Sequence, residues 1–220
     1  MKINTKKTEI MKFNFRTSLD FPPIFTIGDS CPLKIVDHTK ILGIILSCDL
    51  KWSLQVDYMY KRAMKKVWLI RKLKLLDLDM ELILDFYLKE IRSLLEYGAP
   101  VWHSGLTRKM SEKIERVQKL CVKIILGDFT RHTSYTVGCT LLGIEPLYIR
   151  RTELCIRFIQ RTSLEPKHSD LFLKVENTHN TRQKNSTYRE FTYRNKRFYD
   201  SPLCSLTRLL NRNPVANTQR

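Results

Sequence analysis

Residues 53–73 read SLQVDYMYKRAMKKVWLIRKL, and here the pattern of the chain becomes helical. Its apolar side chains recur at steps of three and four residues, which is the spacing of a helix with one buried face. They are Val56, Met59, Ala63, Val67, Ile70 and Leu73. At about 100° per residue, Lys61, Lys65 and Lys72 fall on the opposite face. From Lys61 to Lys74 there are seven basic residues and no acidic one. The pattern predicts a long helix, capped by Ser53, with a basic outer face.

Three more helices are expected downstream, each bounded by capping or turn residues. Asp77 and Asp79 precede a second apolar-periodic stretch, which ends near Gly98. A third helix starts after Thr107 and ends at Gly127, a natural residue for the position after a helix. The fourth runs over about 145–161. We place Tyr148, Thr152, Cys155 and Ile159 on its inner face and Arg150, Arg157 and Arg161 on its outer face.

The first fifty residues favour β-structure instead. Apolar residues alternate in 8–15, and 21–27 ends at a Gly-Asp turn signal, while 34–37 and 41–46 are short strand candidates. We therefore expect a mainly α protein, a helical bundle of about four helices, with a short β-rich N-terminal segment. The expected divisions are a β-rich segment over 1–50, a helical domain over 51–164 and a basic, aromatic segment over 165–220.

Charge indicates the class of partner. The 220 residues include 39 Lys and Arg against 22 Asp and Glu, a net charge of +17. Such an excess does not help folding and points to an anionic partner, with RNA or DNA ahead of a membrane surface. Residues 1–10 lack the apolar core of a signal peptide, and no apolar run approaches the ~20 residues that span a bilayer. We expect an intracellular protein of the nucleus or cytoplasm, with six reduced, mostly buried cysteines.

Basic residues interleaved with aromatic ones are the strongest functional signal. Lysine and arginine neutralise phosphates, and aromatic faces stack on bases. The alternative for each cluster is an ordinary solvated helix face. The candidate nucleic-acid-binding residues are Lys61, Lys65, Lys72, Arg150, Arg157, Arg161, Arg194, Lys196 and Arg197.

The residues suited to catalysis or metal binding are sparse. No glycine-rich phosphate loop is present. Asp77 and Asp79 are suited to a divalent metal, but helix capping is the simpler interpretation. His168 and Asp170 have the H-x-D spacing of an iron site, within a stretch that otherwise reads as a polar loop. We therefore predict no catalytic residue, no metal site and no cofactor in this chain.

The segment 97–106 predicts a joint between two helices. Gly98 permits a turn with positive φ, Pro100 disfavours helix at the residue before it, and Trp102 is large enough to fill the joint. Base stacking by Trp102 or Tyr97 is the functional alternative. The residues with structural roles are Trp52, Tyr97, Gly98, Pro100, Trp102 and Gly127.

Several ordered blocks of the chain resemble one family. ILGIIL (41–46) with DLKW (49–52), LEYGAPVWHSGL (95–106), IERVQK (114–119) with IILG (124–127), and LGIEPL (142–147) are among them. Together they resemble the region that follows the polymerase palm in reverse transcriptases of non-LTR (LINE-type) retrotransposons.

This resemblance implies a truncated RNA-directed DNA polymerase of a mobile element. Residues 1–50 would be a remnant of the palm and 51–164 a thumb-like helical domain that grips template and primer. The family's catalytic aspartates lie in an [FY]-x-D-D box, whereas this chain has no Asp-Asp pair. No catalytic residue carries over, and Mg²⁺ would be needed only by a palm upstream. A missing upstream polymerase portion is thus a possible partner.

A second resemblance covers residues ~33–75. They are similar to a short amino-terminal module of AlkB-type tRNA-modifying proteins, which combine a 2-oxoglutarate/iron dioxygenase with a methyltransferase. Neither catalytic part is recognisable here. An independent oxidoreductase or methyltransferase and a helical protein-interaction module remain the competing classes, and the oligomeric state is open.

Overall fold

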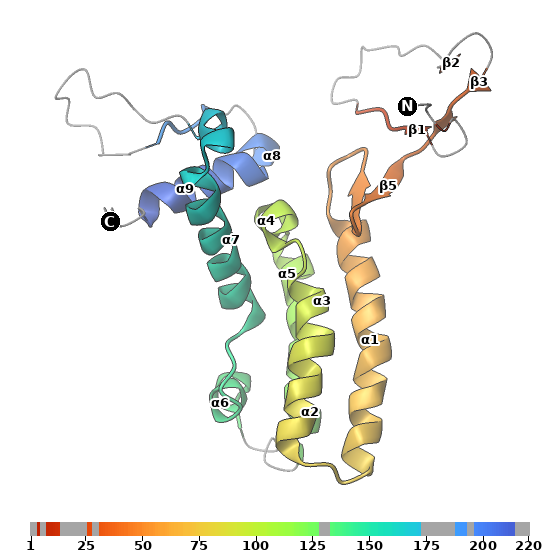
Figure 1. Cartoon of the computed structure of the whole chain (residues 1–220). Helices are drawn as coiled ribbons and strands as arrows, with labels where there is room; N and C mark the ends of the chain where they lie inside the picture. The colour runs from red at the N-terminus through yellow and green to blue at the C-terminus, as the bar shows by residue number, and fades with distance from the viewer. Residues whose placement is uncertain are drawn as a thin grey trace, which may run out of the picture. The chain divides into compact units, whose positions relative to one another are not determined.

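The structure is a computed structural model, and it describes residues 4, 8–13, 26–27, 31–127, 133–172, 188–192 and 196–213. It is mainly α-helical with short strands near the N-terminus, so the predicted fold class is confirmed (Figure 1). Its contacts group the chain into two units, Met1–Tyr58 and Met59–Arg220. The C-terminal segment, for which we expected a separate division, belongs to the second of these units.

The first unit contains three small strand pairs. The strands β1 (Glu9–Ile10) and β4 (Lys34–Ile35) are parallel, and β2 (Thr26–Ile27) and β3 (Cys31–Pro32) are antiparallel. The longest pair is the hairpin of β5 (His38–Ile41) and β6 (Ile44–Ser47). These pairs are too short to stand alone.

The turn of this hairpin corrects the predicted strand over 41–46. Leu42 and Gly43 both have positive φ, +47° and +87°. Two such residues in a row form the tight turn whose twist matches a β-hairpin. The run therefore folds back at Leu42 instead of continuing. The side chain of Gln55 accepts a hydrogen bond of 2.8 Å from the Ile45 amide, which anchors β6 to the start of the first helix.

Helix α1 (Ser53–Leu75) starts in the first unit and continues into the second. Its buried residues repeat the predicted apolar spacing. They are Val56, Met59, Ala63, Val67 and Ile70. Ser53 is the first residue of the helix, and the carbonyl of Trp52, a buried residue, accepts the first helical hydrogen bond, from Val56.

The second predicted helix forms as one rod of three parts, α2 (Met80–Phe86), the π-helical turn η2 (Tyr87–Arg92) and α3 (Ser93–Glu96) (Figure 1). The predicted capping by two carboxylates is wrong. Asp79 occupies the cap position but makes no side-chain cap bond. Asp77 lies in the turn after α1 with φ of +54°.

The predicted joint at Gly98 is present. Gly98 has φ of +66° and separates α3 from α4 (Ala99–Trp102), which the short turn η3 (His103–Gly105) follows. The ring of Trp102 is completely buried, and its Nε1 donates a 2.9 Å hydrogen bond to the Tyr97 carbonyl. Ala99 is helical despite the following Pro100, because proline is tolerated in the first turn of a helix.

Helix α5 (Arg108–Leu126) begins after Thr107, whose hydroxyl accepts from the Met110 amide at 3.3 Å. It ends at Gly127, where φ is +59°. Both ends of this helix were predicted. Helix α6 (Tyr135–Leu141) was not predicted, because its seven residues are too few to display a period.

Helix α7 (Leu147–Leu164) lies at a different rotation from the predicted one. Its inner residues are Leu147, Arg151, Cys155 and Ile159, at steps of four. Thr152 is only half-buried, and Tyr148, which we placed inside, leaves 54% of its surface exposed. Arg151 takes the interior position instead of Tyr148: its Nε and Nη2 have hydrogen-bond partners there, whereas its buried Nη1 has none among the described residues.

The partners of Arg151 come from two other elements. Its Nη2 donates to Ser111 Oγ on α5 at 2.9 Å, and its Nε donates to His103 Nδ1 at 3.4 Å. The guanidinium also lies 6.0 Å from the centre of the Trp102 ring. Since Nδ1 of His103 accepts, its Nε2 carries the proton, and it contacts Thr152 Oγ1 at 3.2 Å.

The C-terminal region contains helices that were not predicted. After η5 (Pro166–Leu171) come α8 (Lys196–Tyr199) and α9 (Pro202–Arg212). Helix α9 packs on α7 around an apolar cluster. Its members are Cys155, Ile159, Phe172, Tyr188, Leu206 and Leu210. The fading pattern beyond Glu165 therefore does not mark the end of the packed structure.

Stability should fall in mild acid because of His103. Burial, reinforced by the charge of Arg151, lowers the pKa of His103 to about 4. The unfolded chain, with a pKa near 6.5, therefore takes up a proton that the folded chain excludes. The free energy of unfolding should be highest above pH 6.5 and decrease by up to about 3 kcal/mol as the pH falls to 4.

Urea unfolding between about pH 7 and pH 4 tests this expectation. The variant His103→Gln has no imidazole to protonate at this position. Its free energy of unfolding should therefore decrease less between pH 7 and pH 4 than that of the wild-type protein. Parallel decreases in the wild-type protein and the variant would contradict the role of His103.

Trp102 should be essential to the helical unit. The change Trp102→Ala removes a completely buried ring and should lower the free energy of unfolding by about 3–5 kcal/mol. Thermal or urea unfolding measures it. The matched control is Trp68→Ala, which removes a half-exposed ring and should change stability by less than about 1 kcal/mol. A Trp102→Ala protein as stable as the wild type would refute this packing role.

Candidate nucleic-acid interface

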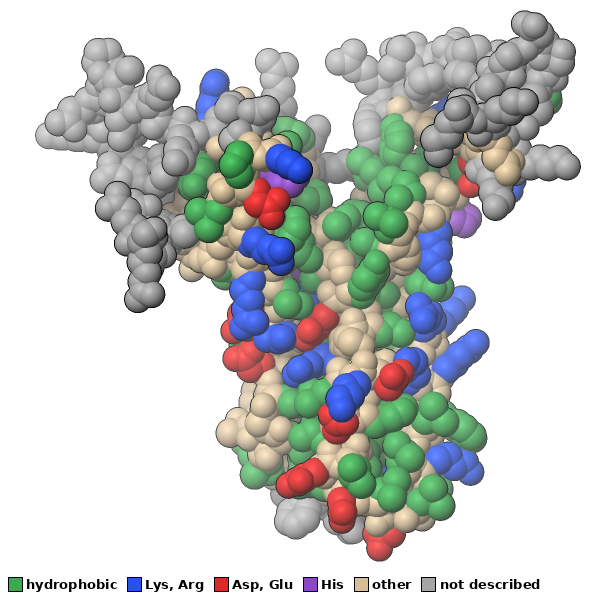
Figure 2. All heavy atoms as spheres, viewed as in Figure 1, with side chains coloured by type: hydrophobic (Ala, Val, Ile, Leu, Met, Phe, Trp, Pro, Cys, Tyr) green, Lys and Arg blue, Asp and Glu red, His purple; other side chains and the backbone are tan. Residues whose placement is uncertain are grey.

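The outer face of α1 carries the clearest basic surface. Lys61, Lys65 and Lys72 lie on it, opposite the buried side chains of Ala63, Val67 and Ile70, and all three lysines are exposed. At 100° per residue the lysines fall within an arc of about 40°, over about 16 Å of helix. Figure 2 shows basic side chains standing out along this helix. These lysines face outward because the apolar side chains on the opposite face of α1 are packed inside.

These three lysines have no carboxylate partner within the described part of the chain. Lys66, by contrast, lies at the side of α1 and forms an ion pair with Glu90 on η2. The charge of the outer face is therefore available to an anion, whereas the charge at the side of the helix is neutralised within the fold.

Trp68 belongs to the same face, and sequence reasoning missed it. It follows Lys65 by three residues and precedes Lys72 by four, so it lies between them on the helix surface. Its side chain is 56% exposed, and the Lys72 Nζ lies 5.4 Å from the centre of its ring. This spacing was visible in the sequence. We call Lys61, Lys65, Trp68 and Lys72 the α1 stripe.

Two of the three candidate arginines on α7 pair with carboxylates. Arg150 does not point freely outward as predicted: its side chain is only 24% exposed and lies 3.4 Å from Glu96 and 3.5 Å from Glu153. Arg157, which is 65% exposed, also pairs with Glu153 at 3.5 Å. Arg161 is exposed at the end of the helix. These carboxylates offset much of the positive charge on α7.

The remaining candidates lie near the C-terminus. Lys196 is exposed at the start of α8, which packs against α9. Arg197 is part of the same short helix, but its side chain is outside the described residues, as is the whole of Arg194. Near them, Phe191 and Phe198 meet edge to face with ring centres 6.4 Å apart.

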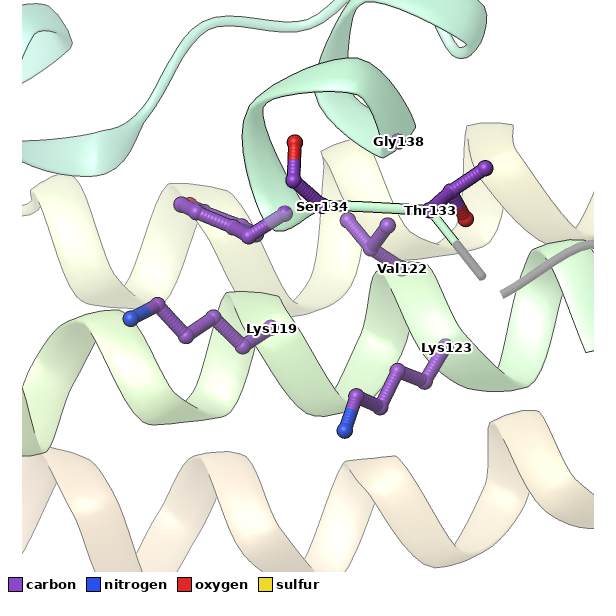
Figure 3. A pocket seen from close by; sticks show the side chains of 7 residues that line it. Lys119, Val122, Lys123, Thr133, Ser134 and Gly138 are labelled. Atoms are coloured by element: carbon purple, nitrogen blue, oxygen red, sulfur yellow. The ribbon is translucent and has the colours of Figure 1, made fainter. Parts of the chain in front are cut away.

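A second basic region borders a pocket of about 290 Å³ between α5 and α6. Lys119, Lys123, Ser134 and Tyr135 are among its lining residues (Figure 3). The Lys119 Nζ lies 5.1 Å from the ring of Tyr135, and the Ser134 hydroxyl already accepts from the Val137 amide. Figure 3 shows both lysine ammonium groups directed away from Ser134. They do not converge on one anion position.

The residues for which we predicted structural roles differ in their burial. Trp102 is completely buried, which excludes it from base stacking, whereas Tyr97 is 56% exposed. Gly98 and Gly127 occupy turns with positive φ.

Burial raises the pKa of Cys121 to about 12 and that of Cys155 to about 11, so both remain neutral thiols.

A metal centre and a membrane span are two other features that a chain of this length can carry. The described residues contain no group of three or more His, Cys, Asp or Glu side chains placed to hold a metal ion. Within the same residues, no helix has the length and apolar character to cross a membrane.

Comparison with known proteins gives no relative. No protein-family model, curated protein or solved structure matches this chain.

Proposed function

We propose that the chain binds nucleic acid through the basic face of α1, as a reverse-transcriptase-like fragment that lacks the catalytic aspartates. The observation that carries this proposal is the alignment of Lys61, Lys65 and Lys72 on one exposed face, where none of the three forms an ion pair with a carboxylate of the described residues. Three ammonium groups in a row suit the regular spacing of phosphates along a strand. The net charge of +17 supports the same class of partner.

The resemblance to non-LTR reverse transcriptases supports the rest of the proposal. The block 95–106 spans the end of α3, the Gly98 turn, α4 and η3, and the block 114–119 lies inside α5. The block 142–147 leads into α7. These three blocks lie at the joints and packed faces of the helical unit, which supports a role in maintaining its fold.

The role we propose is to hold a strand and not to carry out chemistry on it. The lysines neutralise phosphates and release counterions, which gives affinity without base specificity. Polymerisation would need the paired carboxylates and Mg²⁺ ions of a palm domain. In this proposal such a domain is supplied by an upstream portion of the same element.

The salt dependence of binding tests the proposal. Changing Lys61, Lys65 and Lys72 together to Gln should weaken binding to a DNA duplex. It should also lower the slope of log K against log salt by about 0.9 for each phosphate that the protein no longer neutralises. Fluorescence anisotropy with a labelled duplex, repeated at several salt concentrations, measures both quantities.

A matched control removes three other positive charges. Lys51, Lys89 and Arg108 are exposed and ion-paired with Asp49, Asp85 and Glu112. Their combined change to Gln lowers the net charge equally but should leave the slope nearly unchanged. If both triple variants lower the slope to the same extent, overall charge and not the α1 face governs binding.

A further inference from the structure

Trp68 is the exposed tryptophan of this protein. The chain has three tryptophans, and Trp52 and Trp102 are 7% and 0% exposed, against 56% for Trp68. An indole ring on an open helix face contributes little to the packing of the fold. Its position inside a row of lysines places positive charge and an exposed aromatic face on the same surface.

We propose that Trp68 stacks on an unpaired base, so that the α1 stripe selects single-stranded RNA or DNA over duplex. This inference rests on the proposed function, because it concerns the same surface. In a duplex the base faces are stacked on each other and are not accessible to a side chain on the surface. In a single strand each base has a free face, and stacking on an aromatic side chain tolerates any sequence.

The geometry within the stripe supports this combination. Lys65 and Lys72 lie one turn before and one turn after Trp68 on the same face. The Lys72 ammonium group is 5.4 Å from the indole centre, so a phosphate bound to Lys72 brings its own nucleotide next to the ring. From Lys61 to Lys72 the stripe covers about 16 Å along the helix.

A protein partner is the competing occupant. Leu69 and Leu75, which are 42% and 77% exposed, lie beside the stripe and provide apolar area. The lysines decide between the two. Three lysines on the same helix face would be costly to cover with an apolar protein surface, whereas phosphates neutralise them. Nucleic acid is therefore the occupant for which we argue.

The experiment uses the full chain and two probes, a twelve-nucleotide oligo(dT) and a twelve-base-pair duplex, with oligo(U) of the same length as the RNA counterpart. Trp68→Leu should weaken binding to the single strands by about 5- to 100-fold and change binding to the duplex by less than about two-fold. Trp68→Phe, which keeps an aromatic face, should fall between the wild type and Trp68→Leu. Titration with oligo(dT) should quench wild-type tryptophan emission, and this quenching should be absent in Trp68→Leu.

The control is Tyr148→Leu, which removes another exposed aromatic ring, 54% exposed, from α7. It should leave affinity for both probes unchanged. Because Trp68 and Tyr148 are both largely exposed, each variant should melt as the wild type does.

The remaining outcomes separate the two proposals. If Trp68→Leu binds single strands as well as the wild type does, or loses affinity equally for both probes, the stacking inference is overturned while the lysine result still decides the proposed function. Failure of the wild-type protein to bind any probe would overturn both. A wild-type oligomer that Trp68→Leu converts to a monomer would identify the face as a protein interface and overturn the stacking inference.

Discussion

The buried guanidinium of Arg151 is the constraint on which the helical unit depends. A charge removed from water needs polar partners, and Ser111 on α5 and His103 on η3 supply them for Nη2 and Nε, with the ring of Trp102 beside them, while the buried Nη1 has no hydrogen-bond partner among the described residues. Burial lowers the pKa of Arg151, and the charge of Glu115 is the main influence that opposes this shift. The positions of α4, α5 and α7 must therefore agree for this one side chain to be accommodated.

This constraint also determines which positive charges are available outside. With Arg151 turned inward, α7 presents Arg150 to Glu96 and Glu153, and these carboxylates neutralise it within the fold. Helix α1 has no comparable buried charge and no acidic residue from Lys61 to Lys74. The outer lysines of α1 are therefore more available to an anion than the arginines of α7 that pair with carboxylates. The division of charge between the two helices is why the proposed interface lies on α1.

Local patterns in the sequence were sufficient to predict a buried helix face and two turns of the helical unit. The apolar spacing of Ala63, Val67 and Ile70 predicted the buried face of α1, and Gly98 and Gly127 predicted turns that have positive φ. Such signals depend on neighbours within about one helical turn. The same spacing placed Lys61, Lys65 and Lys72 on one face, and it also places Trp68 there, although we did not predict this.

Other features depended on residues distant in the chain. An arginine within a helix reads as a solvent-facing residue, and Arg151 is buried because Ser111 and His103, far away in the sequence, meet it. Helix α9 packs on α7 through an apolar face whose residues repeat at helical spacing, a local signal that sequence reasoning missed. The direction in which α1 presents its basic face was predictable from local spacing alone. The rotation of α7 and the pairing of its arginines required tertiary contacts, because partners for a buried charge are brought together only by folding.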